Sequence, residues 1–326
     1  MEFDWKGFQK ELAEQKVYDA WQYVNSLREM LTYMDMSCVL VEKVYARRKE
    51  QLHSKEQEIF REAAKNGSAE ITEDALHCTG LNIAGIAIDD RLFLQKTTME
   101  FFHYARTCID ILFQIINAAL LGNQSVGIED SKFIGKVSEK LENSDSFKDL
   151  KALVDNNTSN KDFKYIRAFD NYIKHIKTVL VSVRNSFMIG DENTFIIRGF
   201  VKGGHLYQDK DALSAIESAD TYVNQTVTAI LSEVKKQLPN HIDDTKRVHD
   251  VMYKLVVQES DGKTYPDYIA FFIETEDGLE ELEPEIKVRP LIIKPNGEIQ
   301  TSDFQFDTIF IRKAGTDESE IIGYAK

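Results

Sequence analysis

The chain has 326 residues, of which 43% are hydrophobic and 29% charged, a composition typical of a folded protein with room for two domains. Its formal net charge of −14 repels phosphate backbones at long range, which excludes general electrostatic binding of nucleic acid unless basic residues gather locally. The three cysteines, at positions 38, 78 and 108, are too scattered for a zinc knuckle or a disulfide framework.

The sequence has no segment typical of export or membrane insertion. Its first residues lack a basic stretch followed by an apolar one, so we expect no secretory signal. The longest apolar run, within residues 108–122, is interrupted by Asp110, Gln114 and Asn117 and is too short to span a bilayer. We therefore expect a cytoplasmic protein with no membrane partner.

Apolar residues at spacings of three and four predict a series of helices in the first 238 residues, which contain no proline. Residues 8–66 contain neither Gly nor Pro and predict one long helix, or two with a tight joint, ending at Gly67. A loop with a short helix is expected over residues 67–90. The further predicted helices span 91–121, 130–142, 145–155, 162–187 and 210–238, with a small hairpin between the last two.

All five prolines lie in the last 88 residues, where apolar or alternating runs predict strands. Asp261–Gly262, Asp277–Gly278 and Asn296–Gly297 favour tight turns between these runs, and the acidic run at 274–285 is interpreted as a solvated loop or hairpin tip. Residues 240–326 hold 19 acidic and 10 basic residues, so this part is the more acidic. We predict an α+β protein, with an N-terminal all-α helical bundle at 1–238 and a small, mostly antiparallel, acidic β domain at 239–326.

A polar stripe follows one face of the strongly apolar helix predicted over 91–121. A helix this apolar should be buried on most sides, and lone buried charges are costly, so Arg106 and Asp110 are expected to pair with each other or with polar groups of a neighbouring helix. The stripe is either a structural ion pair with polar neighbours or one wall of a substrate site. Its members are His103, Arg106, Thr107, Asp110, Gln114 and Asn117.

A second stripe lies on the helix predicted over 162–187. Ile166, Phe169, Ile173, Ile176, Leu180 and Val183 form its predicted core face. Arg167, Asn171, Lys174 and Thr178 lie nearly opposite, with His175 at the edge. This polar side is either a plain solvent face or the lining of a groove, within one chain or between two subunits.

The motif N-x-x-K-H formed by Asn171, Lys174 and His175, together with the polar stripe on an earlier apolar helix, resembles the HEPN superfamily over about residues 90–238. The resemblance implies an up-and-down helical bundle, often dimeric. Many members are metal-independent ribonucleases of toxin–antitoxin, antiphage and other defence systems. The family motif is an Arg, four to six residues, then a His, often with Asn directly after the Arg. Here Asp170 precedes Asn171, and seven residues lie between the nearest upstream arginine, Arg167, and His175, one more than the usual range of the family motif.

If this face cuts RNA, the residue types restrict the roles. His175 would act as general acid or base, Arg167 and Lys174 would stabilise the phosphate, and Asn171 would orient the histidine or the ribose 2′-OH. Arg106 and Asp110 would contact the substrate from the other helix. Neither a metal nor a cofactor is expected. On this interpretation Asp170 lies beside the phosphate, and its replacement by alanine should do little harm.

Two functions remain open. The first is a HEPN-like protein acting on RNA, as a metal-independent endoribonuclease or an RNA-binding protein, in bacterial stress or antiphage defence. The second is a non-catalytic interaction or scaffold module, in which the helical part forms a homodimer and the β domain binds a protein partner. Asp170 favours the second, whereas the Asn171–His175 spacing and the buried stripe favour the first.

Overall fold

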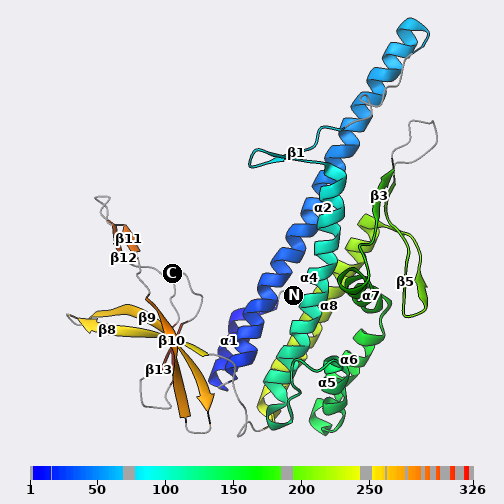
Figure 1. The fold of residues 1–326 in the computed structure, drawn as a ribbon. Helices are drawn as coiled ribbons and strands as arrows, with labels where there is room; N and C mark the ends of the chain where they lie inside the picture. Colours follow the sequence, from blue (N-terminus) through cyan, green and yellow to red (C-terminus); the bar gives the residue numbers. More distant parts are fainter. Residues whose placement is uncertain are drawn as a thin grey trace.

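The computed structural model describes residues 3–15, 17–68, 78–184 and 194–242, and the strands that lie between 252 and 322. The first part is mainly helical and the last part is built of antiparallel strands, which confirms the predicted α+β class (Figure 1). The helices are α1 (Trp5–Glu14), α2 (Tyr18–Asn66), α4 (Asp90–Leu120), α5 (Phe133–Glu142), α6 (Lys148–Ser159), α7 (Lys161–His175) and α8 (Ala212–Gln237).

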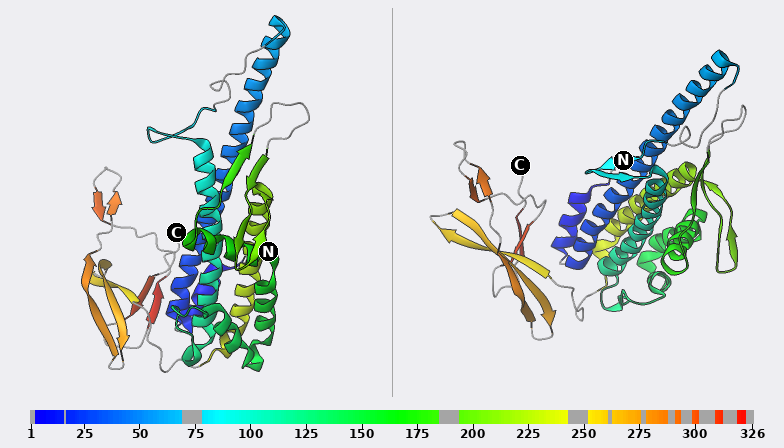
Figure 2. Two further views of the ribbon diagram at one scale, coloured as in Figure 1. Left: turned by 45° about the vertical axis from the view of Figure 1, so that its right-hand side comes forward. Right: turned by 45° about the horizontal axis from the view of Figure 1, so that its top comes forward.

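Helix α2 lies antiparallel to α4, and α8 lies along both, as the views of Figures 1 and 2 show. The end of α2 extends beyond the rest of the bundle and terminates at Gly67, whose φ of 76° gives a left-handed C-cap. Helices α1 and α2 are separate, so the segment predicted to form one long helix, or two with a tight joint, forms two helices. Helices α5 and α6 confirm the two short helices predicted after α4.

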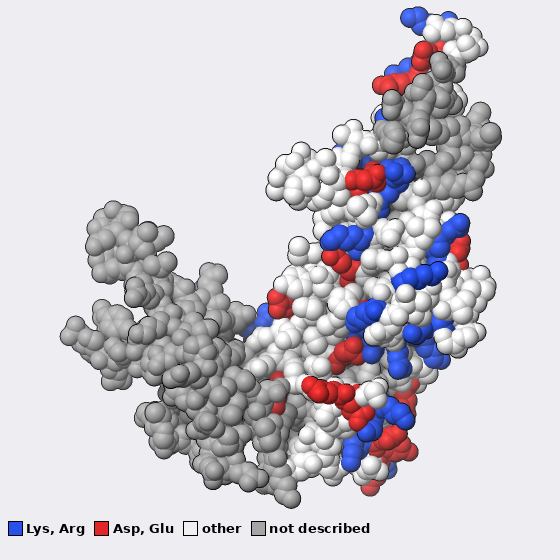
Figure 3. All heavy atoms as spheres, viewed as in Figure 1, with Lys and Arg blue, Asp and Glu red and all other residues white. Residues whose placement is uncertain are grey.

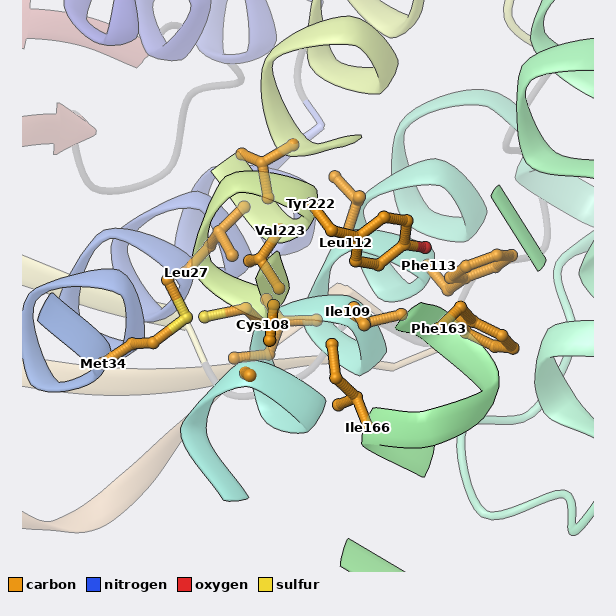
Figure 4. Packing of buried hydrophobic residues seen from close by; sticks show 14 of the residues in the cluster. Leu27, Met34, Cys108, Ile109, Leu112, Phe113, Phe163, Ile166, Tyr222 and Val223 are labelled. Atoms are coloured by element: carbon orange, nitrogen blue, oxygen red, sulfur yellow. The ribbon is translucent and has the colours of Figure 1, made fainter. Parts of the chain in front are cut away.

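The core forms where α2, α4, α7 and α8 meet. Leu27 and Met34 of α2 and Val223 of α8 are fully buried, so each removes its apolar surface from water. Helix α4 is buried on most sides, as predicted from its composition. Figure 4 shows the side chains that fill this region, among them Cys108, Ile109 and Leu112 of α4 and Ile166 of α7.

A small hairpin precedes α4 in the segment expected to be a loop with a short helix. Strands β1 (Leu81–Ile83) and β2 (Ile86–Ile88) pair antiparallel, and the Asn82 side chain accepts a hydrogen bond from the Gly85 N–H in the turn. The Arg47 guanidinium of α2 donates to the carbonyls of Thr79 and Gly80 and fixes the start of the hairpin. Residues 69–77, where the short helix was expected, lie outside the described residues.

The prediction of a helix over residues 162–187 is wrong beyond His175. Helix α7 ends there, and residues 181–184 form strand β3 (Val181–Arg184) instead. The predicted core face ends accordingly, because Ile176 and Leu180 are 54% and 58% exposed. The β-branched residues of this segment favour a strand, and pairing with β4 (Thr194–Ile197) supplies hydrogen bonds that the helix would otherwise provide.

The hairpin predicted before α8 is confirmed as part of two small sheets. Strands β3, β4 and β7 (Lys210–Asp211) form an antiparallel sheet, in which Phe195 and Ile197 of β4 are buried and Phe195 stacks on Tyr45 of α2. Strands β5 (Phe200–Lys202) and β6 (His205–Tyr207) form a hairpin. Its turn places Gly203 and Gly204 at φ of 59° and 76°, the left-handed region that glycine tolerates.

The last part consists of antiparallel strands, as predicted. The acidic run expected to be a loop or hairpin tip falls largely within β10, so most of it is a strand. The helical part ends with the short helix η3 (Leu238–Asn240), and the first strand of the last part, β8, begins at Met252. The domain boundary near residue 239 stays a prediction. The strands are β8 (Met252–Ser260), β9 (Lys263–Thr275), β10 (Gly278–Lys287), β11 (Leu291–Ile293), β12 (Ile299–Thr301), β13 (Ile309–Arg312) and β14 (Ser319–Ile322).

Candidate functional site

The first part of the polar stripe of α4, at His103 and Arg106, faces helix α7, and aromatic packing fixes the two helices together. The rings of Phe102 and Phe169, both fully buried, lie 4.5 Å apart between centroids. The next residue on each helix is polar, His103 on α4 and Asp170 on α7. The buried aromatic contact therefore brings a histidine and a carboxylate to the same edge of the helix pair.

His103 and Asp170 form a hydrogen-bonded pair at this edge. The imidazole Nδ1 lies 2.9 Å from Asp170 Oδ1, and because an ionised carboxylate only accepts, Nδ1 carries the proton and donates. The Asp170 side chain is 1% exposed whereas that of His103 is 42% exposed. A buried carboxylate thus orients an imidazole whose Nε2 makes no hydrogen bond to another described residue, the arrangement that general-base histidines require.

Lys174 provides the second partner of Asp170. Its Nζ lies 2.8 Å from Asp170 Oδ2, one helical turn along α7, and its side chain is 41% exposed. Both carboxylate oxygens are therefore used within the protein. Asp170 is therefore the buried centre of the cluster, so its replacement by alanine would leave both partners unpaired, contrary to the expectation that this change does little harm.

Arg106 and Asp110 pair with each other, as predicted from their spacing. Arg106 Nη2 lies 2.7 Å from Asp110 Oδ1, with the side chains 12% and 39% exposed respectively. Arg106 Nη1 is buried without a hydrogen-bond partner among the described residues. Burial lowers the pKa of Arg106 and raises that of Asp110, so desolvation outweighs the mutual attraction for both groups.

The exposed side of α7 is basic. Lys164, Arg167 and Lys174 are exposed on it, with Lys161 at its start and Lys177 just beyond its end. The acidic residues of α7 are the buried Asp170 and the partly buried Asp162. Figure 3 shows Lys and Arg side chains gathered over the region of α7 and the neighbouring hairpin. A chain of net charge −14 thus carries the local basic surface that binding to a polyanion requires.

The remaining predicted site residues lie around this cluster. His175 is exposed as the last residue of α7, and no hydrogen bond or ion pair joins it to another described residue. Arg167 is exposed, and its positive charge acts to lower the pKa of both Arg106 and Asp110. Asn171 is partly exposed. A catalytic role for His175, Arg167 and Asn171 stays a prediction, as does a groove around them.

Two further residues of the α4 stripe have structural partners. Thr107 Oγ1 donates to the His103 carbonyl, one turn back along the helix. Asn117 is 6% exposed, and its amide both donates to the Val126 carbonyl and accepts from the Val126 N–H, at 2.9 and 2.8 Å. Asn117 therefore holds the loop after α4 in place and lies outside the cluster.

Sequence reasoning missed the pairing at the centre of the site. His103 was recognised only as a member of the stripe, and Asp170 only as a departure from a motif. The available signal was their position, since each directly follows a phenylalanine of its helix, Phe102 or Phe169. Which phenylalanines meet is a property of helix packing, and a single sequence does not contain it.

Comparison of the chain with protein-family models, with curated proteins and with solved structures gives no significant match. Within the described ranges, no helix has an apolar stretch long enough to cross a bilayer. The same ranges contain no group of three or more His, Cys, Asp or Glu side chains placed to hold a metal ion. Function has to be inferred from the arrangement of the residues themselves.

Proposed function

We propose that this protein is a HEPN-like endoribonuclease whose active site lies on the α4–α7 face. The observation that carries the proposal is the orientation of the half-exposed His103 by the buried Asp170, directly beside the basic side of α7. An acid–base group and a polyanion-binding surface are the two parts that RNA cleavage through the 2′-OH requires. The resemblance to the HEPN superfamily adds the reaction, its independence of metal, and the setting of bacterial stress or antiphage defence in the cytoplasm.

The reaction assigns a step to each group. His103 Nε2 takes the proton of a ribose 2′-OH, whose oxygen attacks the adjacent phosphorus while the bond from phosphorus to the 5′ oxygen breaks. The products are a 2′,3′-cyclic phosphate and a 5′-hydroxyl, the latter taking its proton from His175 or from water. Asp170 stabilises the imidazolium that forms, and Arg167 and Lys174 stabilise the charge on the phosphorane.

A cleavage assay with labelled single-stranded RNA in the presence of a chelator tests this assignment. His103→Ala should lower the rate by about 10²–10⁴-fold, the usual contribution of a general base. Asp170→Asn should lower it while leaving substrate binding nearly unchanged. His53→Ala is the matched control, because His53 is exposed on α2 far along the helix and should have no effect.

The outcomes separate the candidate histidines. Loss of cleavage in His103→Ala alone supports the His103–Asp170 pair, and loss in both His103→Ala and His175→Ala supports two proton-transferring histidines. Cleavage that survives His103→Ala but is lost in His175→Ala would overturn the role of His103. Absence of cleavage and of RNA binding in the unmodified protein would overturn the proposed function as a whole.

A second function is favoured by one observation. Both oxygens of Asp170 are occupied by groups of the protein, His103 Nδ1 and Lys174 Nζ, and its place in the sequence is where the family motif often has its arginine. That arrangement suits a bundle that keeps the fold as a non-catalytic homodimeric scaffold, with a protein partner for the β part. Sedimentation at micromolar concentration should then show a dimer, the unmodified protein should cleave no RNA, and His103→Ala should change only the melting temperature.

A further inference from the structure

Next to His103, on the side away from α7, aromatic rings line the seam between α2 and α4. Tyr104 of α4 lies 5.8 Å from the His103 ring between centroids, and Tyr33 of α2 lies 5.5 Å from the Tyr104 ring. Tyr33 is 37% exposed, so part of its ring is open to water. Three rings from two helices therefore form a row that starts at the proposed acid–base group.

The geometry of the row leaves ring surface uncovered. The interplanar angles are 45° and 50°, so neighbouring rings are tilted and do not cover each other's faces as stacked rings would. The Tyr33 hydroxyl donates to Glu29 Oε1 at 2.5 Å, which fixes the ring by its polar end. A fixed, exposed ring offers a stacking surface without the entropy loss that ordering a free side chain would impose.

The charges around the row differ from those on α7. Glu29 holds the Tyr33 hydroxyl, and Glu100 lies one turn before Tyr104, where it pairs with Lys96. Two carboxylates make this side unsuited to phosphates but leave it suited to uncharged aromatic bases. Phosphates fit the basic side of α7, and bases fit the rings across His103 from it.

We propose that Tyr33 and Tyr104 form a stacking site for an unpaired nucleobase, which selects single-stranded RNA for the His103–Asp170 pair; this inference rests on the proposed function. A base on these rings directs its own ribose and phosphate towards His103 and the cations of α7. A base within a duplex is already stacked and paired, so it has no free face for the tyrosines.

The test compares binding of labelled single-stranded oligoadenylate with binding of an abasic oligonucleotide of the same length, by fluorescence anisotropy. Base stacking on an aromatic side chain accounts for roughly 5- to 100-fold in Kd when that side chain is replaced by alanine. We expect Tyr33→Ala and Tyr104→Ala each to weaken oligoadenylate binding within this range and to leave abasic binding unchanged. Tyr33→Phe keeps the ring but loses its hydrogen bond to Glu29, so it should weaken oligoadenylate binding less than Tyr33→Ala does.

The matched control is Phe60→Ala, since Phe60 is another exposed aromatic residue of α2, 48% exposed, and lies away from the row. Tyr33 is exposed, so Tyr33→Ala tests the site even if Tyr104→Ala fails to fold. The salt dependence of binding should stay the same in both tyrosine variants, whereas Lys164→Ala should reduce it.

Three outcomes separate this inference from the proposed function. Weaker oligoadenylate binding in the tyrosine variants, with the Phe60 variant unchanged, supports it. Equal binding of oligoadenylate and the abasic strand, with no effect of either tyrosine, would overturn the stacking site and leave phosphate binding on α7 intact. Binding of neither ligand by the unmodified protein would overturn both.

Discussion

Replacement of Asp110 by alanine tests the energetics of the buried pair on α4. The substitution removes the partner of Arg106, whose side chain is 12% exposed and already has one nitrogen without a hydrogen bond among the described residues. Removing one partner of a buried ion pair leaves an uncompensated charge, which costs about 3–5 kcal/mol. Because Asp110 itself is 39% exposed, water can enter its place, and we expect a loss of about 2–3 kcal/mol.

The opposite substitution should be milder. Arg106→Met removes the buried cation but keeps most of the apolar stem, and the carboxylate left behind is 39% exposed. We expect it to cost less than about 1 kcal/mol. The double variant, Arg106→Met with Asp110→Ala, should resemble the single Arg106 variant and so recover most of the loss.

Thermal unfolding followed by circular dichroism at the helical band measures these changes. At about 2–4 °C per kcal/mol for a chain part of this size, Asp110→Ala should lower the melting temperature by about 4–12 °C. An unchanged melting temperature would show that Arg106 is not held in a water-poor site. A double variant that loses the sum of both single effects would refute the reasoning that the unpaired charge is the cause.

The other predictions concern the two ends of α4. Asp89 caps the helix, and hydrogen bonds from the Arg91 side chain, with those from the backbone N–H groups of Arg91 and Leu92, lower the pKa of Asp89 to about 2. Its stabilisation is present above about pH 4 and is lost as pH falls through about 2, so the deficit of Asp89→Ala, about 1 kcal/mol at pH 7, should shrink over that window in urea titrations. Asp89→Asn keeps the cap without the charge, so at pH 7 it should lose less stability than Asp89→Ala. Asn117→Asp should lower the free energy of unfolding, measured in urea, by about 1–3 kcal/mol, because it places a carboxylate against the Val126 carbonyl. An unchanged urea midpoint would contradict the role of Asn117 in holding the loop after α4.

Local signals in the sequence suffice to predict most of the helices and strands. Apolar spacing and the absence of proline predicted the helical part, and Xaa–Gly pairs among apolar runs predicted the antiparallel strands. The Arg106–Asp110 pair was also predictable, since residues four apart meet on one helix face whatever surrounds it. The end of α7 was not predictable from the sequence, because Ile176, Leu180 and Val183 fit both a helical and a strand pattern. The pairing of β3 with β4 decides in favour of the strand.

The candidate site, in contrast, depends on how the helices pack. His103 and Asp170 are 67 residues apart in the chain, and so their hydrogen bond depends on how α4 packs against α7. The same packing buries Asp170 while it leaves His175 in water at the helix end. The row of Tyr33, Tyr104 and His103 likewise exists only because α2 and α4 lie side by side. Spacing along a helix fixes which side chains share a face, but the neighbour that the face meets follows from the long-range burial of apolar surface, which no local pattern encodes.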